Sequence, residues 1–138
     1  EDVFDLLVVD VFSGDSIPAH MATREAFRLY LDRLAPKGIL ALHLSNWHLD
    51  LSPLVKAAAK EFSLNLAGYM GGADPYNPYE FKSYWVYLSR KPVVFKPRYN
   101  QTYDDFSTVR DIPMMTDAHH SLLQYVGRDP ISRIEARR

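Results

Sequence analysis

The chain has 138 residues, enough for one domain, of which 47% are hydrophobic and 24% charged, ordinary proportions for a globular protein. Its 16 Lys and Arg residues balance 17 Asp and Glu residues, so the charge predicts no nucleic-acid partner. The absence of cysteine excludes disulfides, thiolate zinc sites and cysteine nucleophiles. No apolar run approaches the roughly 20 residues that cross a bilayer, so we expect no membrane contact by this segment.

The first element is an almost unbroken apolar run over residues 3–9 that ends at Asp10. Such a run predicts a strand buried on both faces, as in a parallel sheet. The segment 11–20 is rich in Ser, Gly, Asp and Pro and is predicted to be a loop. Thr23 is the expected N-cap of a helix near 23–35. The apolar residues of that helix recur at helical spacing: Phe27, Tyr30, Leu31 and Leu34.

The pattern then repeats. Residues 39–44 predict a second strand, which ends in the polar residues Ser45 and Asn46. Ser52 and Pro53 are typical of the N-cap and first position of a helix near 53–62. The remaining predicted elements are a strand over 63–70, a loop over 71–82, a strand over 83–89, an irregular segment over 91–113 and a helix from Asp117 to Gly127. Residues 128–138 are expected to form a disordered tail.

This order predicts a single α/β domain over residues 1–138. Strands that alternate with helices are joined by right-handed crossovers and pair in parallel, so we expect a mostly parallel sheet with flanking helices. The last two strands have only a loop between them, and the sequence leaves open whether they form an antiparallel hairpin or lie apart.

Candidate site residues follow the first two strands. Ligands bind beyond the carboxyl ends of strands in open α/β sheets, so we expect Asp10 to face a crevice shared with Ser45 and Asn46. The alternative is that Asp10 caps backbone N–H groups at the start of the loop. Tyr76 and Tyr79, in the predicted loop, are candidates for substrate contact.

The histidines give no metal-binding pattern. His43 and His48 are five apart across a strand end, while His119 and His120 are adjacent and would point about 100° apart on a helix. Neither spacing is a recognised zinc motif, so no metal site is expected. A hydrolase is not expected either, because no Gly-x-Ser-x-Gly elbow is present.

Three segments carry a family resemblance: Asp10-Val-Phe-Ser-Gly-Asp-Ser-Ile-Pro-Ala19, Met21-Ala-Thr-Arg-Glu-Ala-Phe27 and Leu34-Ala-Pro-Lys-Gly-Ile-Leu-Ala41. They resemble the strand-four loop, the following helix start and the entry to strand five of the spermidine synthase (polyamine aminopropyltransferase) family, especially its bacterial spermidine-synthase-like modules. In those modules a Thr-Asp-Asp stretch begins a late helix, and here it reads Thr116-Asp117-Ala118.

The resemblance implies the C-terminal half of a Rossmann-like, methyltransferase-type fold with sheet order 3-2-1-4-5-7-6, of which this chain would supply strands 4 to 7. Family members transfer an aminopropyl group from decarboxylated S-adenosylmethionine to an amine. By this resemblance Asp10 is the catalytic proton acceptor and Asp15 binds the amine, while Ser13, Pro18 and Ala19 lie on the cofactor side. The family's two aspartates are usually three apart, whereas these are five apart.

The same resemblance indicates what the chain lacks. Family members hold the nucleoside with a Gly-rich turn after the first strand and an acidic residue after the second, and no Gly-x-Gly occurs here. We therefore expect no nucleoside, neither S-adenosylmethionine nor its decarboxylated form, to be bound by this fragment. The open edge of the first strand is expected to pair in a homodimer, with the missing half, or with the 91–113 segment.

Two other functions remain open: an S-adenosylmethionine-dependent methyltransferase of the same fold, and a non-catalytic module used for assembly. The expected location is the cytoplasm, either as a free protein or as the soluble domain of a membrane-fused protein.

Overall fold

The structure, a computed structural model, describes residues 3–11, 18–46, 48–72, 76, 81–92, 96, 101–126 and 130–135. Its centre is a five-stranded sheet with the order β1-β2-β4-β3-β5. The strands are β1 (Phe4–Val9), β2 (Leu34–His43), β3 (Asn65–Gly71), β4 (Ser83–Ser89) and β5 (Gln101–Asp104). The helices are α1 (Arg24–Asp32), α2 (Ser52–Glu61) and α3 (Pro130–Glu135), with short 3-10 turns η1 (Ala19–Ala22) and η2 (Leu122–Tyr125). The chain is therefore an α/β protein, as predicted.

The prediction of a mostly parallel sheet is wrong. Among the described strands, only β1 and β2 pair in parallel, while the β2–β4, β4–β3 and β3–β5 pairs are antiparallel. The reason lies in the connection between β3 and β4, which contains no helix among its described residues. Without a crossover helix, β4 returns antiparallel to β3 and inserts between β2 and β3. Strands β1, β2 and β3 consequently run in one direction, and β4 runs against them.

Helix α1 begins as the sequence predicts, because the Thr23 hydroxyl accepts a hydrogen bond from the Ala26 N–H (3.3 Å). Helix α2 begins one position earlier than expected. Its N-cap is Leu51, and the Asp50 carboxylate accepts the Ser52 N–H (2.9 Å). Asp50 thus satisfies a helix-terminal N–H group that Leu51, with its apolar side chain, cannot.

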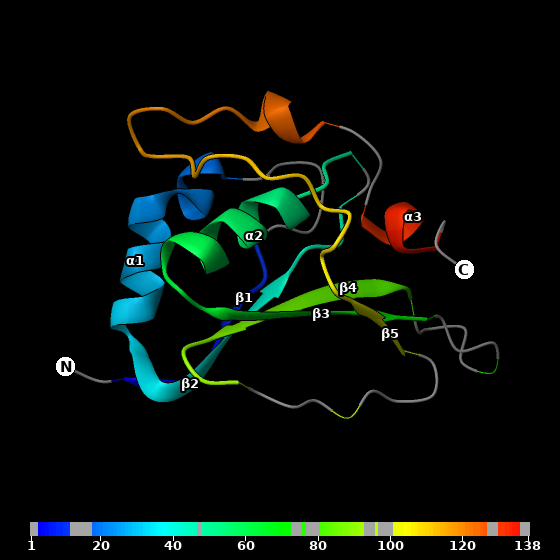
Figure 1. The fold of residues 1–138 in the computed structure, drawn as a ribbon, viewed down its shortest axis with the longest axis horizontal. Coiled ribbons are helices and arrows are strands. Elements are labelled where there is room, and N and C mark those ends of the chain that lie inside the picture. The colour runs from blue at the N-terminus through cyan, green and yellow to red at the C-terminus, as the bar shows by residue number, and fades with distance from the viewer. Residues whose placement is uncertain are drawn as a thin grey trace.

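The hydrophobic core lies on one face of the sheet, beneath α1 and α2 (Figure 1). Alternate residues of the central strands point into it, and all of the following are buried: Leu40 and Leu42 of β2, and Tyr84, Val86 and Leu88 of β4. Phe27 of α1 and Leu54 of α2 are completely buried against them. This packing fixes the register of the strands, since a slip by one residue would turn the apolar set away from the helices.

A glycine makes the β1–β2 pair possible. A Cβ atom on Gly38 would lie 2.8 Å from the carbonyl oxygen of Phe4 and 2.8 Å from the Leu34 side chain. The pairing shifts here, from Phe4 opposite Leu34 to Leu6 opposite Ile39. Gly38 therefore lets β2 bulge while remaining in contact with β1.

Strand β1 is an edge strand with an exposed apolar face. Four apolar residues are between 49% and 57% exposed: Val3, Phe4, Leu6 and Val8. The prediction of burial on both faces is therefore wrong for this strand. β5 comes from the segment that we expected to be irregular, and it pairs with β3 at the opposite edge. Within the described residues, no strand pairs with the outer edge of β1.

The C-terminal region differs from its prediction. Residues Thr116 and His119 form an isolated bridge, so Asp117 does not begin a helix. The expected helix is reduced to the 3-10 turn η2, capped by the Ser121 side chain. Part of the expected disordered tail forms α3, whose Arg133 is held by the core network described below.

Candidate functional site

Asp10 and His43 are neighbours at the carboxyl ends of the two parallel strands. The register pairs Val9 with Leu42, so the next residue along each strand, Asp10 and His43, comes side by side. The Asp10 Oδ1 atom lies 2.7 Å from the His43 Nδ1 atom, while the two side chains are 55% and 18% exposed, respectively. A half-exposed carboxylate with a fixed hydrogen-bond partner therefore occupies the strand end that the sequence singled out.

The His43 ring is also held from the side by Trp85. The two residues pair across β2 and β4, and their rings stack with centroids 4.5 Å apart and planes 9° apart. The His43 Nε2 atom is buried, and no hydrogen-bond partner for it lies in the part of the chain that the structure describes. Since a carboxylate only accepts hydrogen bonds, the bond to Asp10 places the imidazole hydrogen on Nδ1.

Ser45 and Asn46, expected to share a crevice with Asp10, bond to the local backbone. The Ser45 hydroxyl accepts the Tyr84 N–H (2.8 Å), and the Asn46 Oδ1 atom accepts the N–H groups of His48 and Leu49 (2.9 Å each). These bonds attach the end of β2 to β4 and shape the turn that follows.

The other predicted site residues are only partly described. Ser13, Asp15 and Tyr79 lie outside the described residues. Pro18 is the N-cap of η1 and Ala19 is its first residue, and both are half-buried. Tyr76 is 93% exposed. Among the described residues, Asp10 contacts a second candidate group, His43, which was not predicted as a site residue.

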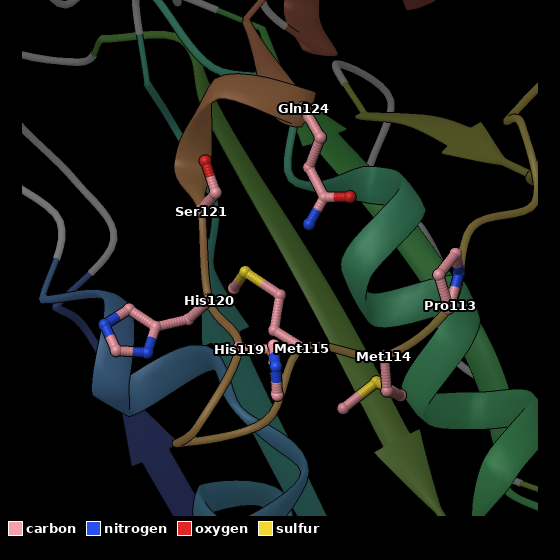
Figure 2. Close-up of a pocket in the computed structure, with 7 residues that line it drawn as sticks. All are labelled: Pro113, Met114, Met115, His119, His120, Ser121 and Gln124. Carbon is pink, nitrogen blue, oxygen red and sulfur yellow. The ribbon is translucent and has the colours of Figure 1, made fainter.

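A shallow pocket of about 470 Å³ lies elsewhere, along the 113–124 segment. It is lined by Pro113, Met114, Met115, His119, His120, Ser121 and Gln124 (Figure 2). The two histidine rings point in different directions in Figure 2, and the His120 Nδ1 atom bonds the Asp117 carbonyl oxygen (3.0 Å). Within the part of the chain that the structure describes, no three His, Cys, Asp or Glu residues are grouped to hold a metal ion.

The segment beside this pocket is attached to the start of α1. The Thr23 hydroxyl donates to Asp117 Oδ1 (2.7 Å), and the Glu25 carboxylate accepts the Asp117 N–H (3.0 Å). The Arg24 N–H donates to the Met115 carbonyl oxygen (2.7 Å). The Thr116-Asp117 motif thus has a structural role here, since it ties the C-terminal region to α1.

A buried ionic network lies on the helix-covered side, and sequence reasoning did not find it. The Asp104 carboxylate is completely buried and accepts bonds from Tyr84 Oη (2.6 Å) and Arg133 Nη2 (2.5 Å). Arg133 also bonds Asp50 and Ser52. Burial works to raise the pKa of Asp104, but the bonds from Arg133 and Tyr84 and the charge of Arg133 outweigh it, so that pKa is lowered. Burial and the Asp104 charge raise the pKa of Tyr84.

An aromatic row crosses the sheet on the face opposite the core. Cross-strand pairing aligns His43 with Trp85, Trp85 with Tyr69, and Tyr69 with Tyr103. The Tyr69 and Tyr103 ring centroids are 5.5 Å apart, and Tyr103 is 53% exposed. Asp10 lies at the β1 end of this row, and the exposed apolar side chains of β1 continue the same face.

No protein-family model matches the chain, and a comparison with curated proteins finds no relative. Among the described residues, no helix is both long and apolar enough to cross a membrane.

Proposed function

We propose that this chain is the C-terminal half of a Rossmann-like S-adenosylmethionine-type transferase domain, related to the spermidine synthases. The observation that carries the proposal is the strand order. The order β1-β2-β4-β3 corresponds to 4-5-7-6, the order that the resemblance implies for this half of the sheet. The open edge of β1 supports it as well, because strand 1 of the complete sheet would pair there.

In this proposal Asp10 accepts the proton of the amine nucleophile. An alkyl ammonium has a pKa of about 10.4, so the amine arrives protonated and must lose a proton before it attacks. The new C–N bond forms as the C–S bond of the sulfonium donor breaks, and the thioether nucleoside leaves. The exposed Asp10 carboxylate at the end of β1 supports this role, because a ligand at the strand ends can reach it.

The remaining parts of the proposed site are Asp15 for the amine and Ser13, Pro18 and Ala19 on the nucleoside side, with Tyr76 and Tyr79 as substrate contacts. The nucleoside itself is held mainly by residues outside this chain, since the chain has no Gly-x-Gly turn. The proposed location is the cytoplasm, as a free protein or as a domain of a membrane-fused one.

The test compares two donors in the product of the complete reading frame. The protein is incubated with putrescine and either decarboxylated S-adenosylmethionine or S-adenosylmethionine, and the products are identified by mass spectrometry. Spermidine and methylthioadenosine from the first donor support an aminopropyltransferase. A methylated amine from the second supports the methyltransferase alternative, and no transfer from either donor, over a range of amines, refutes the enzymatic proposal.

A second function, assembly, is favoured by the exposed apolar face of β1. Phe4, Leu6 and Val8 are each about half exposed, next to a strand edge with which no described strand pairs. Such an edge is a template for pairing with another strand, and exposed apolar patches mark interaction sites. The partner of this edge is the nucleoside-binding half in the intact protein, or a second copy of the chain when that half is absent.

A further inference from the structure

His43 is held in place by two neighbours on two different strands. Its Nδ1 atom bonds the Asp10 carboxylate at 2.7 Å, and its ring lies flat on Trp85. Stacking fixes the plane of the imidazole, and the hydrogen bond fixes its rotation within that plane. A ring fixed in both respects presents its Nδ1–H to the carboxylate from one direction.

The protonation of the ring follows from the burial of its second nitrogen. A hydrogen on Nε2 would be a buried donor without an acceptor, because Nε2 has no hydrogen-bond partner among the described residues. Leaving a buried donor unpaired is costly, whereas a hydrogen on Nδ1 is satisfied by Asp10. The structure therefore favours the tautomer with its hydrogen on Nδ1.

We infer that His43 is a positioning residue for Asp10: its Nδ1–H holds a carboxylate oxygen at the end of β1, where the amine is proposed to bind. This inference rests on the proposed function and adds a residue to its site. Catalytic groups are often oriented by a third residue in this way, because a small displacement of the reacting group lowers the rate strongly. Trp85 acts one step further away, by holding the ring of His43.

The first test needs no enzymatic activity. The histidine ring nitrogens of the full chain are observed by ¹⁵N NMR, and the His43 signals are assigned by their loss in His43→Gln. The inference predicts a hydrogen on Nδ1 bonded to Asp10 in the wild-type chain, and a shifted Nδ1 signal in Asp10→Ala, where that hydrogen bond is lost. A wild-type ring with its hydrogen on Nε2, or an Nδ1 signal unchanged in a folded Asp10→Ala chain, would overturn the inference.

The second test uses the transfer assay of the complete protein. His43→Asn places its amide nitrogen near the position of Nδ1, whereas His43→Gln places it near Nε2 and His43→Phe keeps only the stacking. We expect kcat to fall about 10- to 100-fold in the Gln and Phe variants and less than about threefold in the Asn variant, with KM for the donor nucleoside unchanged. A Phe variant with the wild-type kcat refutes positioning.

The two tests separate the inference from the proposed function. If the ring carries its hydrogen on Nδ1 but the wild-type protein transfers no group, the Asp10–His43 geometry holds and the transferase proposal fails. If transfer occurs and kcat is insensitive to His43, the transferase proposal holds and the positioning role fails.

Discussion

The Asp104 carboxylate and the Arg133 guanidinium form an ion pair between β5 and α3, 29 residues apart in the sequence. The carboxylate is fully buried and the Arg133 side chain is 15% exposed. Tyr84 donates a further bond to the same carboxylate oxygen. The approach of Tyr84 and Asp104 depends on Gly68, where a Cβ atom would lie 2.9 Å from the Tyr84 hydroxyl oxygen. The pair therefore attaches the C-terminal helix to the sheet.

Removing Arg133 should destabilise the fold strongly. Arg133→Ala leaves a buried carboxylate without its cation, and breaking a buried pair in this way costs about 3–5 kcal/mol. The matched control is Lys82→Ala, which removes the exposed ion pair between Lys82 and Glu135 of the same helix and should cost less than about 1 kcal/mol. Urea unfolding curves of the two variants measure both values. If the two variants lose equal and small amounts of unfolding free energy, Arg133 does not neutralise Asp104.

The same network predicts an acid limit to stability. The folded-state pKa of Asp104 lies below its ordinary value of 3.8, so the native state favours the ionised carboxylate. The contribution of the Asp104 carboxylate to the free energy of unfolding is therefore fully present above about pH 4. It is lost as the pH falls through the folded-state pKa. Urea midpoints between pH 2 and pH 6 should drop at the acid end, and the drop should be smaller in Asp104→Asn. If the urea midpoint of Asp104→Asn falls by the same amount at low pH, other carboxylates cause the fall.

Local signals predicted much of the fold. The bounds of β4 were predicted from its aromatic and β-branched residues, and the start of α1 from Thr23. The pairing direction was not predictable in this way, because it depends on the helix-free connection between β3 and β4. Strand β5 carries no apolar run, and it exists through its pairing with β3, such as Tyr103 opposite Tyr69. A four-residue strand of this kind has no signal of its own.

The candidate site was predicted only in part. Asp10 was found because it ends an apolar run, whereas His43 was considered only as a metal ligand. One signal could have found it: if β1 and β2 are parallel neighbours, the last residues of the two strands lie side by side. The partner on β4, Trp85, could not be found by that argument, since its register depends on the antiparallel insertion of β4.

The exposed edge of β1 predicts self-association of the isolated chain. We expect a dimer formed through β1, and Leu6→Lys should convert it to a monomer, because a lysine on an edge strand opposes pairing. Leu29→Lys on α1 is the control, since Leu29 is 59% exposed and Leu6 is 57% exposed. Light scattering after size-exclusion chromatography measures the mass. A wild-type monomer, or a dimer that both variants retain, would contradict pairing through β1.

Nucleoside binding by the isolated chain should be weak. The backbone N–H groups of a Gly-rich turn and a ribose-binding carboxylate normally provide much of the recognition of such ligands, and the sequence contains no Gly-x-Gly. Calorimetric titration of the chain with decarboxylated S-adenosylmethionine should give no saturable heat at micromolar concentrations. Micromolar affinity would mean that this chain contains the nucleoside site, and the half-domain assignment would be wrong.

The most direct test of the central claim is the turnover of Asp10→Asn in the complete protein. The substitution keeps the size of the side chain and an oxygen that can accept from His43, but it removes the proton acceptor. We expect an unchanged melting temperature and a loss of about 100-fold or more in kcat for aminopropyl transfer. Asp5→Asn, at an exposed aspartate of the same strand, should keep the wild-type rate. If Asp10→Asn transfers the group as fast as the wild type, Asp10 is not the proton acceptor and the proposed site is wrong.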